Sequence, residues 1–404
     1  NMEKLKIVGG NKLSGSISCS GAKNAALPML AATILCDKPI TFKNLPYLQD
    51  ITTMFEILGS MGADITLNEN MDFIISTSKL HDFEARYELV KTMRASILVL
   101  GSMVAKYGYA KIALPGGCAI GSRPVNYHLK ALERLGAEIS LNNGYIEAKA
   151  KKLIGADIEF DGVTVTGTAN IMMAASLAEG VTTLTNVAKE PEISDLADFL
   201  NSMGARISGA GTDEIRVEGV EELTGTTFKI PADRIEAGTY LVAAAITNGK
   251  ITIKKIDPTR MGSIIETLQK AGADVSLNEN SISLDMTKNA IKPVDIVTAP
   301  FPGFPTDMQA QFTVLNCIGH GESSVKETIF ENRFMHVQEL NRMGTDITIN
   351  GTTALINGVD SISGAQVMAT DLRASASLIL AGLVAKGETI VDRIYHIDRG
   401  YERI

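Results

Sequence analysis

The sequence predicts an α/β protein of two lobes, each an inverted barrel with helices inside and sheets outside, built from six repeated units of about 70 residues. Two observations carry this prediction: a short helix-Gly-strand signature that recurs along the chain, and a nearly all-apolar helix that precedes each signature. At 404 residues the chain is also long for a single hydrophobic core.

The signature marks the end of an amphipathic helix, a glycine, and an alternating strand. The glycine is expected at a position where the helix ends with positive φ, which residues with a side chain adopt rarely. A sixth unit has its apolar helix and a strand near 389–391, but no such signature. The five copies are Leu58–Ile65, Leu132–Ile139, Leu200–Ile207, Leu268–Val275 and Leu340–Ile347.

The apolar helices explain the inverted arrangement. A helix that is apolar on nearly all faces must be buried, whereas an alternating strand such as Thr183–Thr185 can show one face to water. The six predicted helices are Ala25–Leu35, Met93–Ala105, Ala169–Ala178, Ile235–Thr247, Met308–Ile318 and Leu372–Ala385.

Grouping the units three and three predicts one lobe over residues 21–230 and a second over 1–20 plus 231–404, with a hinge near Lys229–Pro231. The N-terminal strands Leu5–Val8 and Ser14–Ser18 precede the first apolar helix. They are expected to return and complete the second lobe.

Composition excludes several classes of function. The 38 basic and 46 acidic side chains give a net charge of −8 without a basic run, so nucleic acid is not an expected partner. The charged N-terminus lacks a signal-peptide pattern, and the longest apolar stretch, Ala374–Ala385, is short of the roughly 20 residues that cross a bilayer. We expect a cytoplasmic protein without membrane insertion.

The four cysteines, Cys19, Cys36, Cys118 and Cys317, lie far apart in sequence. They lack the CxxC spacing of a structural zinc site, and their positions do not suggest a disulfide framework. The sequence also lacks a Walker A motif and a GxGxxG after a strand, so neither ATP nor NAD is indicated.

Polar residues at the starts of the apolar helices indicate anion binding, because helix N-termini favour negative charge. Lys23 and Asn24 open the first helix, Arg94 the second and Arg373 the sixth. One such cation is usually solvated surface, but several together favour an anionic ligand. The opening of the fourth helix, Asp233–Glu236, fits ordinary capping equally well.

Two further segments carry candidate chemistry. Asp307 follows three prolines at the start of the fifth helix, where it is either an N-cap or a general base held among cations. The glycine-rich loop Leu114–Pro124 carries Cys118 and Arg123, and a thiol on such a loop near a positive charge is expected to be reactive.

At these residues the chain resembles the enolpyruvyl transferase family, and most of all the branch that acts on a UDP-sugar. The resemblance covers Leu5 to Ile404. It rests on GAKNAALP at 21–28, TMRAS at 92–96, GGCAIGSRPV at 116–125, FPTDMQ at 304–309, ENRFMH at 331–336, DLRAS at 371–375 and DRGYE at 398–402.

The resemblance implies the two-lobed inverted barrel. It also implies transfer of the enolpyruvyl group of phosphoenolpyruvate to the 3-hydroxyl of UDP-N-acetylglucosamine with release of phosphate, the reaction that opens peptidoglycan synthesis. It implies no metal and no organic cofactor.

The resemblance also assigns site residues. It implies that Lys23, Cys118, Arg123 and Arg399 surround the donor phosphate, with Asn24 close by, and that Arg333 and Arg373 hold the donor carboxylate. It makes Cys118, a target of the antibiotic fosfomycin, the proton donor, and Asp307 the acceptor of the sugar proton. The positions that it implies for the UDP-sugar are Asn24, Arg94, Arg123, Pro124, Val125, Asn126, Tyr127, Thr166, Gly167, Asp307 and Ile329.

One departure and two alternatives remain. Many relatives have SVGAT before the third helix, where this chain has Val165-Thr166-Gly167-Thr168, which weakens the expectation that Thr166 and Gly167 hold the diphosphate. The sister enzyme acting on shikimate 3-phosphate shares the fold and the donor, but it lacks the cysteine-bearing loop. A non-catalytic UDP-sugar-binding homologue would need the cations but not Cys118 and Asp307.

Overall fold

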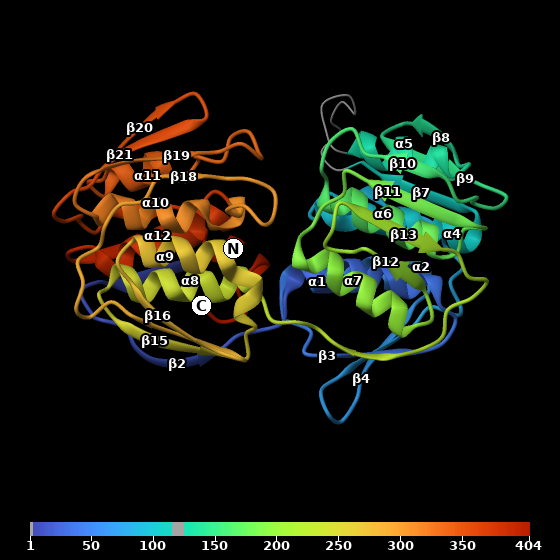
Figure 1. Cartoon of the computed structure of the whole chain (residues 1–404), viewed down its shortest axis with the longest axis horizontal. Coiled ribbons are helices and arrows are strands. Elements are labelled where there is room, and N and C mark those ends of the chain that lie inside the picture. Colours follow the sequence, from blue (N-terminus) through green and yellow to red (C-terminus); the bar gives the residue numbers. More distant parts are fainter. Residues whose placement is uncertain (1–2, 115–124) are drawn as a thin grey trace. The chain divides into compact units, whose positions relative to one another are not determined.

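The computed structural model describes residues 3–114 and 125–404. The chain divides into two compact units, unit 1 (Asn1–Ser20 with Ala232–Ile404) and unit 2 (Gly21–Pro231). Each unit has a hydrophobic core of its own. Unit 2 runs from blue to green in Figure 1, and most of unit 1 runs from yellow to red.

The described part of unit 2 holds three four-stranded sheets of one design: a parallel pair, followed by two strands that pair antiparallel. The first sheet is β14 (Thr227–Lys229), β3 (Ile40–Lys43), β5 (Phe73–Ser76) and β4 (Asp64–Leu67). The second is β6 (Glu84–Ala85), β7 (Tyr109–Ala113), β9 (Tyr145–Lys149) and β8 (Glu138–Asn142). The third is β10 (Asp157–Glu159), β11 (Val181–Thr185), β13 (Glu214–Glu218) and β12 (Arg206–Ser208).

Unit 1 repeats the design twice and then shortens it. The fourth sheet is β2 (Ser14–Ser18), β15 (Lys250–Lys254), β17 (Ser281–Asp285) and β16 (Asp274–Asn278). The fifth is β18 (Ile296–Val297), β19 (Glu322–Lys326), β21 (Thr353–Asn357) and β20 (Asp346–Asn350). In the described residues the sixth has three strands, β22 (Gln366–Met368), β23 (Glu388–Asp392) and β1 (Lys4–Val8).

The N-terminal strands complete unit 1, as the sequence predicts. Strand β2 pairs parallel with β15, and β1 pairs antiparallel with β23. In the other sheets the signature supplies the edge strand, so the sixth unit, which has no signature, lacks that strand in the described chain. The pairing of β14 with β3 near the end of unit 2 was not predicted.

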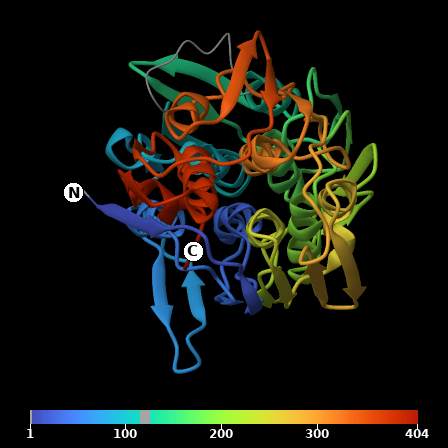
Figure 2. The same cartoon turned by 90° about the vertical axis from the view of Figure 1, so that its left-hand side faces the viewer.

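The apolar helices are buried, as predicted. In unit 1, α8, α10 and α12 pack against one another, and Figure 2 shows them in yellow, orange and red. The helices of unit 2 that correspond to the prediction are α1 (Lys23–Ala32) with η1 (Thr33–Leu35), η2 (Arg94–Leu98) with α4 (Val99–Tyr107), and α6 (Val165–Ser176). Those of unit 1 are α8 (Arg234–Ile246), α10 (Gln309–Ile318) and α12 (Leu372–Val384).

The signature helices end as predicted. Their glycines, Gly62, Gly136, Gly204, Gly272 and Gly344, have φ of 114°, 103°, 103°, 106° and 99°. These helices are α2 (Gln49–Met61), α5 (Val125–Arg134), α7 (Pro191–Ser202), α9 (Gly262–Lys270) and α11 (Val337–Arg342). The remaining helical turns are α3 (Tyr87–Val90), η5 (Pro258–Met261), η6 (Thr306–Met308) and η7 (Ile394–Arg399).

The predicted start of the third apolar helix was wrong. The helix begins at Val165, four residues earlier than expected, because the Thr164 hydroxyl accepts a hydrogen bond from Gly167 N and caps it. Thr166 and Gly167 therefore lie within the first turn of the helix, not before it. Gly167 is buried, and its N–H already has a partner.

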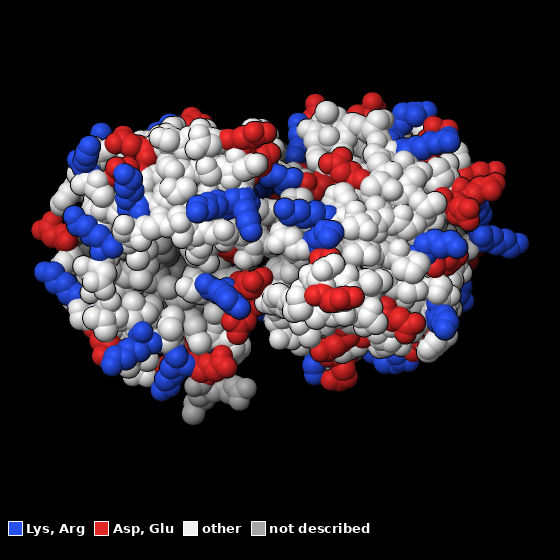
Figure 3. All heavy atoms as spheres, turned by 90° about the horizontal axis from the view of Figure 1, so that it is seen from below, with Lys and Arg blue, Asp and Glu red and all other residues white. Residues whose placement is uncertain are grey.

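The surface charges relate to the predicted absence of nucleic-acid binding, and the helix lengths relate to the predicted absence of membrane insertion. On the face drawn in Figure 3, Lys and Arg side chains lie among Asp and Glu on both units. None of the helices in the described part of the chain has the length and apolar character that a membrane crossing requires.

A buried carboxyl group lies where the chain leaves unit 1. Glu236 of α8 is 3% exposed, and its Oε1 accepts a hydrogen bond of 3.0 Å from Ser20 N, the last residue of the N-terminal part of unit 1. Burial raises the pKa of Glu236 to about 7; the Ser20 hydrogen bond opposes this rise and the Asp233 charge adds to it.

Because the folded pKa of Glu236 is above its ordinary value, the folded state binds more protons between about pH 4.5 and 7. The wild-type free energy of unfolding should therefore fall as the pH rises through this window. Glu236→Gln keeps the accepting oxygen and cannot ionise, so relative to wild type it should gain roughly 1–3 kcal/mol between pH 5 and pH 8. Urea unfolding at both pH values measures this. The exposed Glu279→Gln is the control, and equal pH dependence of both variants would contradict the expectation.

Candidate active site

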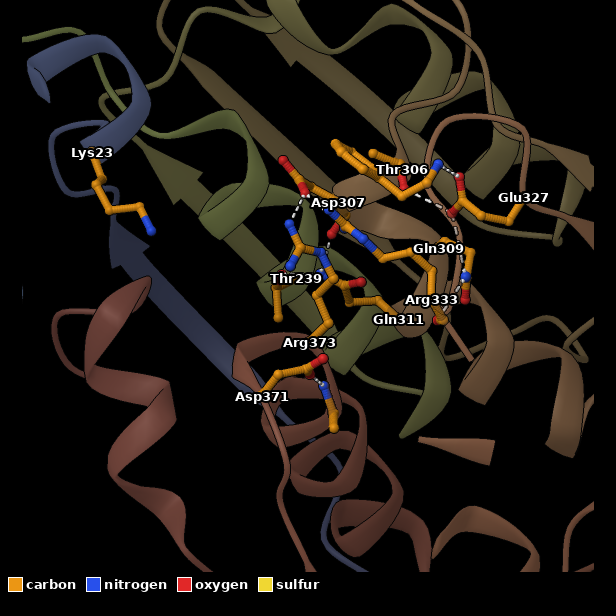
Figure 4. A network of polar contacts seen from close by, with 12 residues as sticks. Lys23, Thr239, Thr306, Asp307, Gln309, Gln311, Glu327, Arg333, Asp371 and Arg373 are labelled. Carbon is orange, nitrogen blue, oxygen red and sulfur yellow. Dashed lines mark hydrogen bonds and ion pairs between the residues drawn. The ribbon is translucent and has the colours of Figure 1, made fainter. Parts of the chain in front are cut away.

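The structure brings three predicted site residues of unit 1 together around one carboxylate. Asp307 Oδ1 accepts a hydrogen bond of 2.6 Å from Arg373 Nη2 and lies 3.5 Å from Arg333 Nη1 (Figure 4). Arg333 comes from the loop after β19, and Arg373 is the second residue of α12. Three segments that are distant in sequence thus meet at one ion cluster.

Local contacts hold each member of this cluster. Asp371 caps α12 by accepting a hydrogen bond of 2.7 Å from Ala374 N, which fixes the turn that carries Arg373. The guanidinium of Arg333 lies 4.0 Å from the centre of the Phe330 ring, close enough for a cation–π contact. The side chain of Arg333 is 15% exposed, so it is not a solvated surface cation.

Asp307 is not an N-cap, which was one of its two interpretations. It lies within the 3₁₀ turn η6, and its carboxylate is directed at the arginines. Its carbonyl accepts a hydrogen bond of 3.0 Å from Gln311 Nε2, and the same amide donates to Thr239 Oγ1 at 3.0 Å. The buried Tyr401 hydroxyl lies 2.7 Å from that Thr239 oxygen, so the turn is anchored to α8 and to the end of the chain.

The electrostatics of the cluster favour an anionic ligand. Burial opposes ionisation of Asp307, but the charges of Arg373 and Arg333 outweigh it and lower its pKa to about 2. Burial and the nearby Arg373 charge lower the pKa of Arg333 to about 10. Arg333 Nη1 and Arg373 Nε are buried without a hydrogen-bond acceptor in the described chain. Two cations that share one carboxylate, with donors to spare, can accept a second anion.

Lys23 is the first residue of α1 in unit 2. Its Nζ lies 3.1 Å from Asp50 Oδ2, and its side chain is 15% exposed. The next residue, Asn24, is exposed, and Arg94 is exposed at the start of η2. These polar groups lie at the beginnings of buried helices, where the sequence places them.

The remaining predicted residues divide into described and undescribed ones. Val125, Asn126 and Tyr127 form the first turn of α5 and are half-buried. Arg399 ends η7, and Ile329 is exposed on the loop after β19. Cys118, Arg123 and Pro124 lie outside the described residues.

Thr166, predicted to contact the acceptor diphosphate, is held by a polar chain that the sequence analysis missed. The Asn170 Oδ1 accepts from Gly101 N at 2.7 Å, and its Nδ2 donates to Ile97 O at 2.9 Å, which fixes the orientation of the amide. The second Nδ2 hydrogen faces His128 Nδ1 at 3.0 Å, and His128 Nε2 lies 3.3 Å from Thr166 Oγ1.

The hydrogen bonds from Asn170 through His128 to Thr166 determine which atoms carry the protons. Burial lowers the pKa of His128 to about 4, so the imidazole is neutral near pH 7. Because Asn170 donates to Nδ1, Nδ1 accepts and the proton is on Nε2. His128 then donates to the Thr166 oxygen, which leaves the Thr166 hydroxyl hydrogen for another acceptor. An anion at the start of α6 would be such an acceptor. Asn170, the one residue of α6 with an amide side chain, was the sequence signal for these contacts.

The described residues contain no group of three or more His, Cys, Asp and Glu side chains that is arranged to hold a metal ion. Lys23, Arg94 and Arg373, which lie at the starts of buried helical segments, are cations and hydrogen-bond donors. Such groups suit phosphate and carboxylate ligands.

Comparison with known proteins defines the class first. A family model described as EPSP synthase (3-phosphoshikimate 1-carboxyvinyltransferase) matches residues 7–404. The chain belongs to this family of carboxyvinyl transferases, as the sequence motifs indicate.

Within this family, two relatives with the same enzyme name are similar to the chain over its whole length. The UDP-N-acetylglucosamine 1-carboxyvinyltransferase of Hydrogenovibrio crunogenus is 57% identical over 403 residues, which cover 100% of this chain and 96% of that protein. The protein of the same name from Coxiella burnetii is 57% identical over 404 residues, covering 100% of this chain and 93% of its own length.

Solved structures confirm the predicted fold class. The enolpyruvyl transferase NikO from Streptomyces tendae matches with a TM-score of 0.89 at 24% identity, covering 99% of this chain and 95% of its own. EPSP synthase from Acinetobacter baumannii matches with a TM-score of 0.76 at 18% identity, covering 99% and 96%.

The proton arrangement around Thr166 is testable. We expect the ¹⁵N spectrum of His128 at pH 7 to show a neutral ring protonated at Nε2. Thr166→Val should weaken binding of UDP-N-acetylglucosamine by about tenfold, because a hydrogen bond to a charged group is lost, whereas Thr166→Ser should bind nearly as wild type. Calorimetry measures both. A charged ring, a proton on Nδ1, or unchanged binding by Thr166→Val would contradict this arrangement.

Proposed function

We propose that this chain transfers the enolpyruvyl group of phosphoenolpyruvate to the 3-hydroxyl of UDP-N-acetylglucosamine and releases phosphate. The observation that carries the proposal is full-length identity of 57% to two relatives named for this transfer. Identity to the EPSP synthase structures is 18–19%, so an acceptor like shikimate 3-phosphate is less favoured. A binding protein without activity would not need an aspartate held between two arginines.

The reaction balances through three proton transfers: one to C3, one from the sugar hydroxyl and one from C3. A proton added to C3 of phosphoenolpyruvate makes C2 electrophilic, and the sugar oxygen bonds to C2 as its own proton leaves. The C2–O bond to phosphate then breaks and C3 loses a proton, which restores the double bond. We assign the proton to C3 to Cys118 and the proton from the sugar to Asp307, because a thiol and a carboxylate can exchange protons near neutral pH.

The donor carries two kinds of anionic group, and the chain supplies cations for both. In this proposal Lys23, Arg123 and Arg399 bind its phosphate, with Asn24 and the Cys118 thiol close by. Arg333 and Arg373 bind its carboxylate, to which planar guanidinium groups are suited. The partly buried position of Lys23 and of both carboxylate-binding arginines supports these roles.

The contacts of Asp307 with the two arginines make its basicity depend on donor binding. With a pKa of about 2, Asp307 is a weak base while Arg373 and Arg333 pair with it. A donor carboxylate competes for the same two guanidiniums, and every contact it takes from Asp307 raises the pKa of that carboxylate. Asp307 thus becomes a stronger base when the donor is bound, which restricts deprotonation of the sugar to the complex that can react.

The acceptor is assigned to the remaining predicted positions. Arg94, the 123–127 segment and the start of α6 at Thr166 and Gly167 are proposed to hold the uridine diphosphate part. Asn24, Asp307 and Ile329 are proposed to lie against the sugar. The occupied N–H of Gly167 makes the Thr166 hydroxyl the better donor of the pair. We place the reaction in the cytoplasm, at the first committed step of peptidoglycan synthesis and hence in support of cell shape and division.

Phosphate release tests the function directly. We expect phosphate from phosphoenolpyruvate only when UDP-N-acetylglucosamine is also present, with little release when shikimate 3-phosphate replaces it. Asp307→Asn should lower kcat by about 100-fold or more, because an amide cannot accept the proton. Release that does not depend on the UDP-sugar, or that is faster with shikimate 3-phosphate, would exclude the proposed function.

Thiol labelling tests the role of Cys118. The other three cysteines are buried, and burial raises the pKa of each; that of Cys317 rises to about 12. Fosfomycin should therefore form its adduct on Cys118, and Cys118→Ser should lose both the adduct and most activity. Cys118→Asp keeps an acidic proton and should retain turnover without labelling. A mass spectrum with the adduct on Cys19, Cys36 or Cys317 would refute this assignment.

A further inference from the structure

Glu327 is a buried carboxylate that is not among the assigned site residues. It is hydrogen-bonded to the turn that carries Asp307 and to the segment that carries Ile329. Glu327 follows β19 directly and is 3% exposed. Both of its oxygens accept hydrogen bonds, from side chains and from backbone (Figure 4). Burying a carboxylate is costly unless donors compensate it, so its contacts indicate what it holds in place.

One oxygen faces the turn that carries the proposed base. Glu327 Oε1 accepts from Thr306 Oγ1 at 2.7 Å, and Thr306 is the residue before Asp307. It also accepts from Gln309 Nε2 at 3.4 Å, and that amide lies 3.2 Å from the carbonyl oxygen of Arg333. This oxygen therefore connects the Asp307 turn to the backbone of Arg333.

The other oxygen orders the segment on the far side of the carboxylate. Glu327 Oε2 accepts from Ile329 N at 3.0 Å and from Phe330 N at 3.4 Å. Ile329 is a proposed sugar contact, and the Phe330 ring lies against the Arg333 guanidinium. Thr298 Oγ1, at the end of β18, donates to the same oxygen at 2.8 Å and fixes the carboxylate to the sheet.

We propose that Glu327 is a positioning residue for the proposed transfer, fixing the Asp307 turn and the Ile329–Phe330 segment relative to each other and to the fifth sheet. This inference rests on the proposed function. One rigid anchor between the base and the acceptor segment has a chemical use, because displacement of reacting groups by about 1 Å costs roughly 100-fold in rate.

The carboxylate is suited to this role and an amide is not. The donors on Oε2 include two backbone N–H groups that cannot reverse their direction, and Thr306 and Gln309 supply donors on the other side. A glutamine in this place has one accepting oxygen and one donating nitrogen. With its oxygen toward the two backbone N–H groups, its nitrogen would face the donating Gln309 amide, and the Thr306 hydroxyl would have to accept where it now donates.

The test compares Glu327→Gln with two variants of a single contact. Glu327→Gln should lower kcat about 10- to 100-fold and raise the KM for UDP-N-acetylglucosamine several-fold, per folded protein. Thr306→Val removes only the contact beside Asp307, so it should lower kcat about tenfold and leave that KM unchanged. Thr306→Ser restores the hydroxyl and should restore kcat.

The matched control is Asp295→Asn. Asp295 also bridges the β18 and β19 region, accepting from Ser324 N at 2.9 Å, but it is exposed, and its hydrogen bonds are to Ser324 and not to the Asp307 turn or the Ile329 segment. It should change neither kcat nor KM. If Glu327→Gln and Thr306→Val lower only the melting temperature, with wild-type kcat and KM for the folded fraction, Glu327 is part of the scaffold and the inference is wrong. If the wild-type protein fails to release phosphate with both substrates, the proposed function fails first.

Discussion

Six helices that are buried on almost every side constrain everything else in this protein. In α1, every residue from Ala25 to Ala32 is buried, and α10 is buried from Gln309 to Cys317. Such helices have no lateral surface for a ligand, so their ends are where polar chemistry meets water. Lys23, Arg94, Thr166 and Arg373 all lie in the first turn of a helical segment. The inverted arrangement therefore explains why the candidate site residues lie at helix starts.

Polar groups deeper in these helices make hydrogen bonds that join neighbouring helices and hold their ends in place. Asn170 and His128 connect α6 to α4 and α5, and Gln311 connects α10 to Thr239 and Tyr401. An unsatisfied buried donor costs about 1–3 kcal/mol, so such a network has few alternative arrangements. In the proposed function, the rigidity that a proton transfer needs is thus supplied in part by residues to which no substrate contact is assigned.

The ion pairs of Asp307 have a different role from the packing and hydrogen bonds of the buried helices. Asp307 is held ionised by two arginines that the proposed donor would also use. The charges of the cluster compensate one another, and that same compensation makes the aspartate a weak base. In the proposed reaction, donor binding and the basicity of Asp307 are therefore coupled through this one set of contacts.

The sequence by itself determined the repeats, the buried helices, the signature glycines and the cations at the helix starts. These features are local or periodic: an apolar run decides burial, and a glycine decides where a helix ends. The motifs also identified the family, and the resemblance predicted Arg333 and Arg373 for the donor carboxylate and Asp307 for the proton of the sugar. Only the tertiary structure decided which partners these groups have without a ligand. Arg373 pairs with Asp307, Asn170 is linked through His128 to Thr166, and Glu327 contacts Thr306. These contacts join residues whose positions follow no repeat in the sequence. Hydrogen bonds and ion pairs of this kind depend on how distant segments pack, and a single sequence carries no measure of that distance.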